Sequence, residues 1–392
     1  MQTKLSRLLT PPTNNWPLAR IGKLLATGMM LASVAACNSP ASFQRAAKAA
    51  IFGRPVVNEL PFKVQLLAKA HDRVLHDMIN AAAFSPDGKF VAIGSMHSFH
   101  LVIWDIENQR TVRQIPLPSG TERDSLVWSA NGRFLATYKG GAVLVFEPFS
   151  GELLQKFVGK EIGAGGPLHL RLNETESKLA VVLFDAKDIG PNLAIFDTAN
   201  WQFKAFETRK KLNLRNAFWA KDKIITLGSD RSRDVFLSQL DPASGEISGR
   251  LVITSPVNPA YDQSPSIELK AMCTNTEGTR MAVTYQHPIE PEPKLKIVNL
   301  DTLALEKSLS MSSDDVLDSC HYSPDSRYLF IQTMTGPIRI VDTQSYKVIG
   351  SIPLPHKTSD GGLAISRDGK RLAIGQESEL LIYQLGPLPE NQ

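Results

Sequence analysis

Short apolar, β-branched runs alternate with polar turns through most of the chain. Residues 81–115 show the pattern most plainly, in the order strand, turn, strand, loop, strand, turn, strand. In the first turn, Ser85-Pro86-Asp87-Gly88, the proline presets φ, the aspartate can bond its own backbone and the glycine accepts a positive φ. Runs of this length bounded by such turns predict a four-stranded antiparallel unit.

The same unit recurs along the chain. It returns in residues 126–157, 168–206, 217–247, 269–309, 319–352 and, without its fourth strand, 362–385. The first turns recur about every 43–55 residues, close to the 40–50 of a four-stranded propeller blade. Residues 62–69 supply one spare strand ahead of the first unit, and pairing it with the last unit would close a ring without exposed sheet edges.

The fold class predicted is therefore all-β: a seven-bladed β-propeller of four-stranded blades, closed by an N-terminal strand. The position of the fourth strand within residues 233–266 is ambiguous, which leaves six or eight blades open.

Two features carry a family resemblance: the Ser-Pro-Asp-Gly-like turns and the acidic residues that end the third strands. The latter are Trp104-Asp105, Phe146-Glu147, Phe196-Asp197 and Val341-Asp342. Over residues 61–385 this pattern resembles the WD40 and YVTN families of β-propellers. Only Trp104-Asp105 is the WD dipeptide itself, and the Gly-His dipeptide and the Asp-Gly hairpin before the third strand are absent. The resemblance thus implies a degenerate bacterial propeller and leaves the buried hydrogen-bonded tetrad of WD40 blades unsupported.

The first 36 residues are typical of an export signal. They hold four basic residues and no acid, and an apolar run follows in residues 24–36. This run is too short to span a bilayer as a helix, and it ends in small residues. Val34-Ala35-Ala36-Cys37 resembles the lipobox of bacterial lipoproteins, which implies that Cys37 is lipidated. A plain secretory signal is the alternative. Asn38 after the cysteine favours the outer membrane over the inner one, by resemblance to a bacterial sorting rule.

These patterns predict four parts: a lipoprotein signal peptide (1–36), a lipidated tether (37–60), the propeller (61–386) and a C-terminal tail (387–392). The whole chain has a net charge of +4. All four excess positive charges, Lys4, Arg7, Arg20 and Lys23, lie in the signal, so the rest of the chain is neutral. We therefore expect no nucleic-acid partner, since nucleic-acid binding rests on basic charge.

One face of the propeller is expected to carry the binding loops, because it receives both the inter-blade connections and those between the second and third strands. Basic residues gather there on the third and fourth blades, and Tyr261 lies in a long proline-containing connection, residues 248–266. A solvated rim of mixed charge and a taxon-specific insertion are the structural alternatives. The candidate binding residues are Lys160, Lys187, Arg209, Lys210, Lys211, Arg231, Arg233 and Tyr261.

Two cysteines remain besides Cys37. Cys273 and Cys320 lie on the predicted inner strands of the fifth and sixth blades. We expect two small buried side chains in tight strands, with a disulfide between them as the less favoured alternative.

No contiguous catalytic motif is present: the chain lacks G-x-S-x-G, H-E-x-x-H, a P-loop and G-x-G-x-x-G. Four histidines near the first blade have no ligand spacing, so we expect no metal site, and no cofactor is predicted. The function expected is a membrane-anchored lipoprotein of the cell envelope, in the outer membrane and facing the periplasm, whose propeller binds or scaffolds envelope proteins or peptides. The inner membrane and the cell surface stay open as locations. A propeller hydrolase or lactonase is the alternative, since YVTN-like propellers include such enzymes.

Overall fold

The computed structural model describes residues 60–75, 78–121, 125–139, 141–158, 166–184, 191–208, 212–229, 234–254, 268–286, 294–312, 315, 317–334, 336–355 and 362–386. Contact clustering separates residues Met1–Pro55 from Val56–Gln392, and the described residues all belong to the second unit. No helix in this described part is long and apolar enough to cross a membrane.

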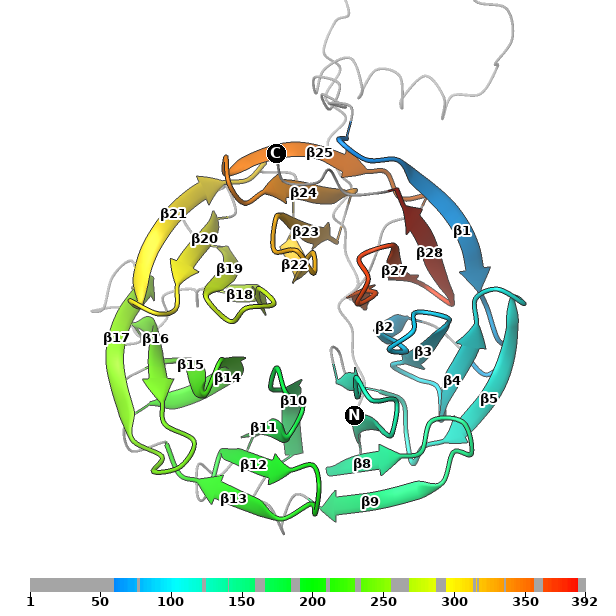
Figure 1. Cartoon of the computed structure of the whole chain (residues 1–392), viewed down its shortest axis with the longest axis horizontal. Helices are drawn as coiled ribbons and strands as arrows, with labels where there is room; N and C mark the ends of the chain where they lie inside the picture. The colour runs from blue at the N-terminus through cyan, green and yellow to red at the C-terminus, as the bar shows by residue number, and fades with distance from the viewer. Residues whose placement is uncertain are drawn as a thin grey trace, which may run out of the picture. The chain divides into compact units, whose positions relative to one another are not determined.

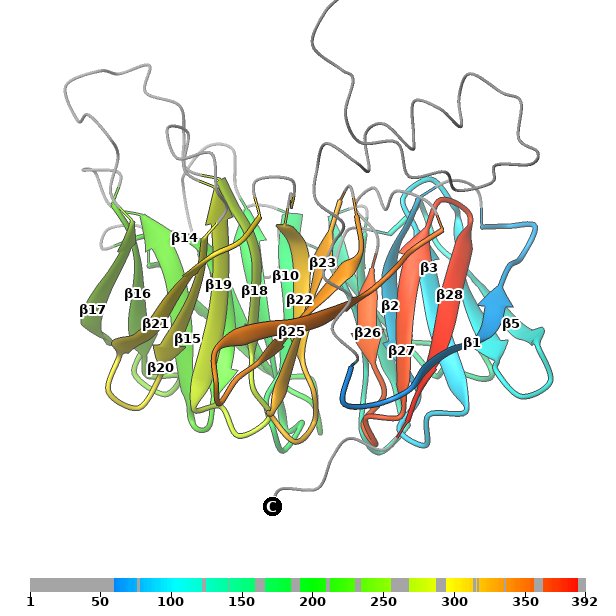
Figure 2. The same ribbon diagram turned by 90° about the horizontal axis from the view of Figure 1, so that it is seen from above.

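Seven four-stranded antiparallel sheets form the blades of a closed ring (Figure 1). Within each blade the strands run outward from the centre in sequence order, except in the last blade. The turns between strands 1 and 2 and between strands 3 and 4 lie on one face, here called the turn face. The remaining connections lie on the other, the loop face. Figure 2 shows the strands running between these two faces. The seven-bladed prediction is confirmed.

The strand bounds follow the predicted repeats except in blade 4, where the fourth strand occupies Ile247–Thr254 and so includes residues that were expected to belong to the connection 248–266. The first two blades contain β2 (Ile79–Phe84), β3 (Phe90–Ser95), β4 (His100–Asp105), β5 (Arg110–Pro116), β6 (Leu126–Trp128), β7 (Leu135–Lys139), β8 (Ala142–Phe146) and β9 (Leu153–Val158). Blades 3 and 4 contain β10 (Gly166–Leu172), β11 (Lys178–Phe184), β12 (Leu193–Asp197), β13 (Phe203–Phe206), β14 (Asn213–Ala220), β15 (Lys223–Ser229), β16 (Val235–Leu240) and β17 (Ile247–Thr254). Blades 5 and 6 contain β18 (Glu268–Thr274), β19 (Arg280–Gln286), β20 (Lys294–Asn299), β21 (Ala304–Ser310), β22 (Leu317–Tyr322), β23 (Tyr328–Thr333), β24 (Ile338–Asp342) and β25 (Lys347–Ile352). Blade 7 contains β26 (Leu363–Ile365), β27 (Arg371–Gln376), β28 (Glu379–Leu385) and β1 (Val64–Ala70).

The N-terminal strand closes the ring, as the sequence predicts. β1 pairs antiparallel with β28, from Val64 opposite Leu385 to Ala70 opposite Leu380. Figure 1 shows the two strands side by side at the outer edge of blade 7. The main chain extends this contact at one end, where the Gly386 amide donates to the Lys63 carbonyl at 2.7 Å. The first and last strands of the ring therefore share one blade.

The hydrophobic core is divided among the seven blade interfaces. Each of the seven clusters of buried residues draws on two neighbouring blades, and the cluster between blades 7 and 1 includes residues of both chain ends. Middle strands such as β3 are buried on both faces and read as apolar runs, whereas outer strands such as β5 alternate with exposed residues. Blade-to-blade packing therefore supplies the main apolar burial of the fold.

A buried serine organises the first turn of four blades. In blade 6 the Tyr328 amide donates to Ser323 Oγ at 2.9 Å, and the Arg327 amide donates to Asp325 at 3.1 Å. Ser85, Ser129 and Ser366 accept the equivalent bond in their own blades. In blades 3 and 5 the amide oxygens of Asn173 and Asn275 accept it instead. In these six blades the first turn is therefore stabilised by a side-chain hydrogen-bond acceptor at one equivalent position.

The acidic residues that end the third strands cap the second turn. Asp105 accepts from the Asn108 amide at 3.0 Å, and Asp342 accepts from the Ser345 amide at 2.7 Å. Asp197 and Asp241 make similar bonds to following amides. Among the described residues the buried Trp104 Nε1 has no hydrogen-bond partner, so the WD dipeptide here is a strand end and turn cap without a WD40 tetrad.

Ser323→Ala should lower the free energy of unfolding by about 1–2 kcal/mol, because it leaves a buried amide without its acceptor. Ser323→Asn should lose less, since Asn173 and Asn275 perform this role in two other blades. Urea denaturation of the two variants measures the difference. Equal stability of wild type and Ser323→Ala would contradict this account of the turn.

The turn that Asp342 caps is predicted to be sensitive to acid. Burial raises its pKa, but hydrogen bonds from Ser345 and Gln344 and the charge of Arg327 lower it by more, so the pKa lies below its usual value. A lowered folded-state pKa contributes stability above the unfolded pKa of about 3.9, and that stability is lost as the pH falls through the folded value. Asp342→Asn should therefore cost about 1 kcal/mol near pH 7 and much less near pH 2.5.

Denaturant unfolding at both pH values tests this expectation. The exposed Asp222→Asn is the matched control and should change stability little at either pH. A cost for Asp342→Asn that stays the same at the two pH values would show that the carboxylate charge is not what holds the turn.

Candidate functional site: the central channel

The inner strands enclose a cavity of about 700 Å³ at the centre of the ring. Ligand pockets commonly measure about 300–1,000 Å³, so this volume suits a small molecule. The described lining comes mostly from β10, β14, β18 and β22, with one or two residues from each of the other blades. It comprises Ala82, Leu126, Val127, His169, Leu170, Arg171, Leu172, Asn213, Leu214, Arg215, Asn216, Phe218, Ala271, Met272, Cys273, Thr274, Ser319, Cys320, His321 and Leu363.

The described lining carries charge of one sign. Arg171 and Arg215 contribute two guanidinium groups, His169 and His321 contribute imidazoles, and no Asp or Glu is among the described lining residues. Asp318 in β22 is a carboxylate next to a lining residue, but it is only 1% exposed and lies outside the lining. A channel with low-dielectric walls concentrates the field of such groups. The cavity is therefore suited to an anion.

Arg171 is held in place on β10. Its guanidinium lies over the Phe218 ring, with Cζ 5.0 Å from the centroid, and one of its nitrogens donates to the Leu170 carbonyl at 2.8 Å. Its own carbonyl accepts from Trp219 Nε1 at 3.0 Å, which fixes β10 against β14. Stacking on an aromatic ring restricts the orientation of the guanidinium.

Arg215 occupies a β-bulge. The register of β14 with β15 shifts between Leu214 and Asn216, so Arg215 is the extra residue. Bulges at the equivalent place in β2 and β22 hold Asn80 and Asp318, which are 0% and 1% exposed. Asn80 bonds Thr121 in the adjoining connection, whereas Arg215 is exposed and lines the cavity. Bulges can re-aim a side chain beside a functional site.

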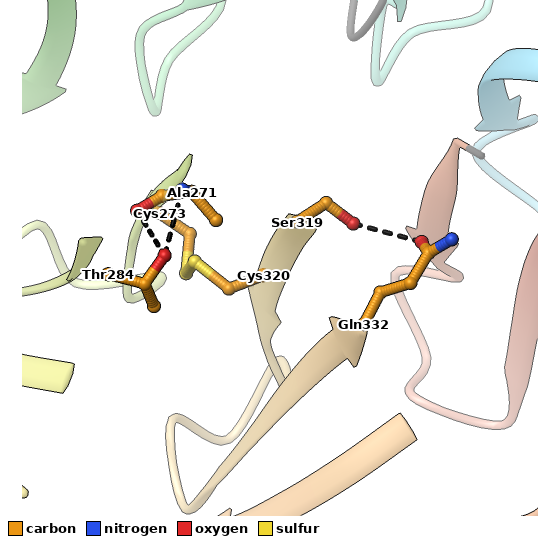
Figure 3. Close-up of a disulfide and its surroundings, with 6 residues drawn as sticks. All are labelled: Ala271, Cys273, Thr284, Ser319, Cys320 and Gln332. Carbon is orange, nitrogen blue, oxygen red and sulfur yellow. Dashed lines mark hydrogen bonds between the residues drawn. A yellow bond between two sulfur atoms is a disulfide. The ribbon is translucent and has the colours of Figure 1, made fainter. Parts of the chain in front are cut away.

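A disulfide joins the inner strands of blades 5 and 6 in the channel wall. Cys273 and Cys320 are bonded, with their Cα atoms 5.8 Å apart (Figure 3). The expectation of two unbonded buried cysteines is therefore wrong, and the less favoured disulfide alternative is right. Both residues are nearly buried, and they are close enough because β18 and β22 are neighbouring inner strands.

Polar side chains tie the inner strands to the second strands on either side of the disulfide. Thr284 Oγ1 accepts from the Ala271 amide at 2.8 Å, and Ser319 Oγ donates to Gln332 Oε1 at 3.0 Å (Figure 3). Both second-strand residues are fully buried. These bonds fix the backbone of the channel wall that carries Met272 and His321.

An ion pair crosses the channel mouth on the turn face. Arg367, in the first turn of blade 7, donates to Glu176, in the first turn of blade 3. Glu176 also accepts from the Ala130 amide in blade 2. Blades 1 and 2 lie between blades 7 and 3 in the ring, so this pair narrows the turn-face end of the channel. The loop face is the expected route of entry.

The binding residues predicted from the sequence are not placed by the structure. Lys160, Lys187, Arg209, Lys210, Lys211, Arg231, Arg233 and Tyr261 all lie outside the described residues, as does Cys37. In the sequence, only Leu212 separates Arg209, Lys210 and Lys211 from β14, the strand that carries Arg215. Among the described residues there is no group of three or more His, Cys, Asp or Glu able to hold a metal ion.

Sequence reasoning missed Arg171 and Arg215. A signal was present, because both are arginines inside predicted inner strands, LHLRL and NLRNAF. A charge in such a strand needs either a buried partner or an open channel.

Comparison with known proteins supports the fold. No family model and no curated protein matches the sequence. A solved structure of hydrazine synthase from Kuenenia stuttgartiensis is similar, with a TM-score of 0.61 and 14% identity. The match covers 80% of this chain and 97% of that one. At such low identity the likeness shows a shared propeller fold and nothing of its chemistry.

The Cys273→Ser, Cys320→Ser double variant should lower the free energy of unfolding by about 2–4 kcal/mol under oxidising conditions, because the bond closes a long loop. Reduced wild type should lose a comparable amount. Guanidinium unfolding with and without reductant measures both, and thiol titration of the unfolded protein counts free cysteines. Reaction of Cys273 and Cys320 as free thiols without reductant would contradict the disulfide.

Proposed function

We propose that the chain is an exported lipoprotein whose propeller is a binding or scaffolding module at the cell envelope. The observation that carries this proposal is the Cys273–Cys320 disulfide. Structural disulfides persist in oxidising compartments such as the periplasm and are rare in the cytosol. The pairing therefore supports the export suggested independently by the basic, apolar and small residues before Cys37.

Lipid on Cys37 would tether the protein to the membrane, in the outer membrane and facing the periplasm. Lipoprotein anchors carry more than one acyl chain, and two or more chains hold far more firmly than a single one. Residues 37–60 would separate the propeller from the bilayer. The location is favoured by Asn38 after the cysteine.

The expected partners are envelope proteins or peptides bound on the loop face. Rigid strands support the connections there, and the basic residues of blades 3 and 4 together with Tyr261 supply the contacts proposed. The described residues make a rigid ring rather than a hinged pair of lobes, which suits a docking platform.

Cys37→Ala should abolish incorporation of labelled palmitate and release the protein from the membrane fraction. The physical reason is that the acyl chains, rather than the neutral propeller, supply the membrane affinity. Labelling in cells followed by fractionation measures both effects. Cys320→Ser is the matched control, because it removes a cysteine that would not be lipidated.

Unchanged palmitate labelling of Cys37→Ala would remove the lipoprotein assignment. The binding role is tested separately, by crosslinking the full chain in envelope fractions and identifying the partner. Replacing Arg209, Lys210 and Lys211 with glutamine should then reduce capture of that partner. Failure to capture any envelope protein, with hydrolysis of a lactone panel, would replace scaffolding by the hydrolase alternative.

A further inference from the structure

The position of Arg215 in the β14 bulge indicates ligand binding, because the packing of the ring does not explain it. The bulge residues Asn80 and Asp318 are buried within the fold. Arg215, at the equivalent position, is exposed to the cavity, and the described residues give its guanidinium no carboxylate partner. Its long, charged side chain is therefore positioned by the backbone without contributing to blade packing.

A second guanidinium lies in the same cavity on the neighbouring strand. Arg215 is near the start of β14 and closer to the loop face, whereas Arg171 is near the end of β10 and closer to the turn face. Phe218 fixes Arg171 by stacking. Two cationic side chains in one cavity, with no carboxylate among its described lining residues, favour an anion.

The rest of the lining is largely apolar. Ala82, Val127, Leu172 and Met272 line the same cavity as the two arginines and are partly exposed. Pockets with this composition receive a ligand's carbon skeleton on the apolar wall and orient it by a few polar groups. An ion with no organic body, such as inorganic phosphate, would leave the apolar wall unused.

We propose that the central channel binds a small organic oxyanion, a carboxylate or a phosphate ester. Arg215 binds the anionic group, Arg171 is a second cationic contact deeper in the channel, and the apolar wall holds the organic body. Guanidinium groups match both anions, because their planar donors form paired hydrogen bonds to oxyanions. The inference does not depend on the lipid anchor or on a protein partner, so it goes beyond the function proposed above.

Calorimetric titration of the full chain in a neutral detergent tests the site with three probes. Phenylacetate supplies a carboxylate, phenyl phosphate a phosphate ester, and phenylacetamide a neutral molecule of the same shape as the first. At low ionic strength at least one oxyanion should bind with a Kd of about 1 mM or below, and phenylacetamide at least about tenfold more weakly. The stronger oxyanion identifies the favoured class.

Arg215→Gln should weaken that binding at least about tenfold, the loss expected for one charge-assisted contact. Arg215→Lys should restore part of it, since the charge remains. The control is Arg133→Gln, an exposed arginine on a turn of blade 2 outside the lining, which should bind as wild type does. Thermal melting of each variant checks the fold, and Arg171→Lys, which keeps the charge, provides an independent second variant if Arg215→Gln does not fold.

Three results would overturn the proposal. These are no binding by either oxyanion, equal binding of phenylacetate and phenylacetamide, and equal affinity of Arg215→Gln and Arg133→Gln. None of them bears on Cys37 lipidation or on partner capture, so failure here is distinguishable from failure of the proposed envelope role.

Discussion

The pairing of β1 with β28 is the contact on which the ring depends. Every blade buries both faces against its neighbours, so a break at any interface would expose a hydrophobic cluster from each side. Blade 7 is built from the two ends of the propeller, and its completion must wait for the entire chain. The Lys69–Glu379 ion pair across this junction is exposed on both sides and adds little. The main-chain ladder and the burial of Ala68, Ala70 and Leu385 hold the junction.

Closure also creates the site, because seven inner strands held in a ring must leave a channel between them. The side chains of that channel are set by a backbone that is fixed from behind: by Thr284 and Gln332 in the second strands, by Trp219 between β10 and β14, and by the disulfide between β18 and β22. These links lie in the four blades that supply most of the cavity wall. A binding group on such a wall loses little entropy when a ligand arrives.

The sequence predicted the repeated turns and the closing strand, because these rest on local chemistry. It favoured seven blades but left six or eight open, because the position of the fourth strand within residues 233–266 was ambiguous. Ser85, Ser129, Ser323 and Ser366 stand before equivalent turns, and the apolar runs between them have strand lengths. The disulfide could not be predicted in the same way. The repeats placed Cys273 and Cys320 on the inner strands of neighbouring blades, but the 5.8 Å between their Cα atoms depends on how the two blades pack. The role of Arg215 could not be predicted from the sequence for a related reason. A bulge shifts the two-residue period, so the direction of its side chain cannot be counted from Ala217.

Charge is balanced in the chain beyond its first 36 residues, yet it is separated within the propeller. Several carboxylates hold turns: Asp105, Asp197, Asp241 and Asp342 accept hydrogen bonds from the amides that follow the third strand. Glu176 is engaged with Arg367 across the turn-face mouth. These acids lie in turns and are not among the described residues that line the channel. A fold that repeats an acidic turn cap in blade after blade can therefore be neutral as a whole and still present a positive interior, and it is this local sign, rather than the net charge, that selects a ligand.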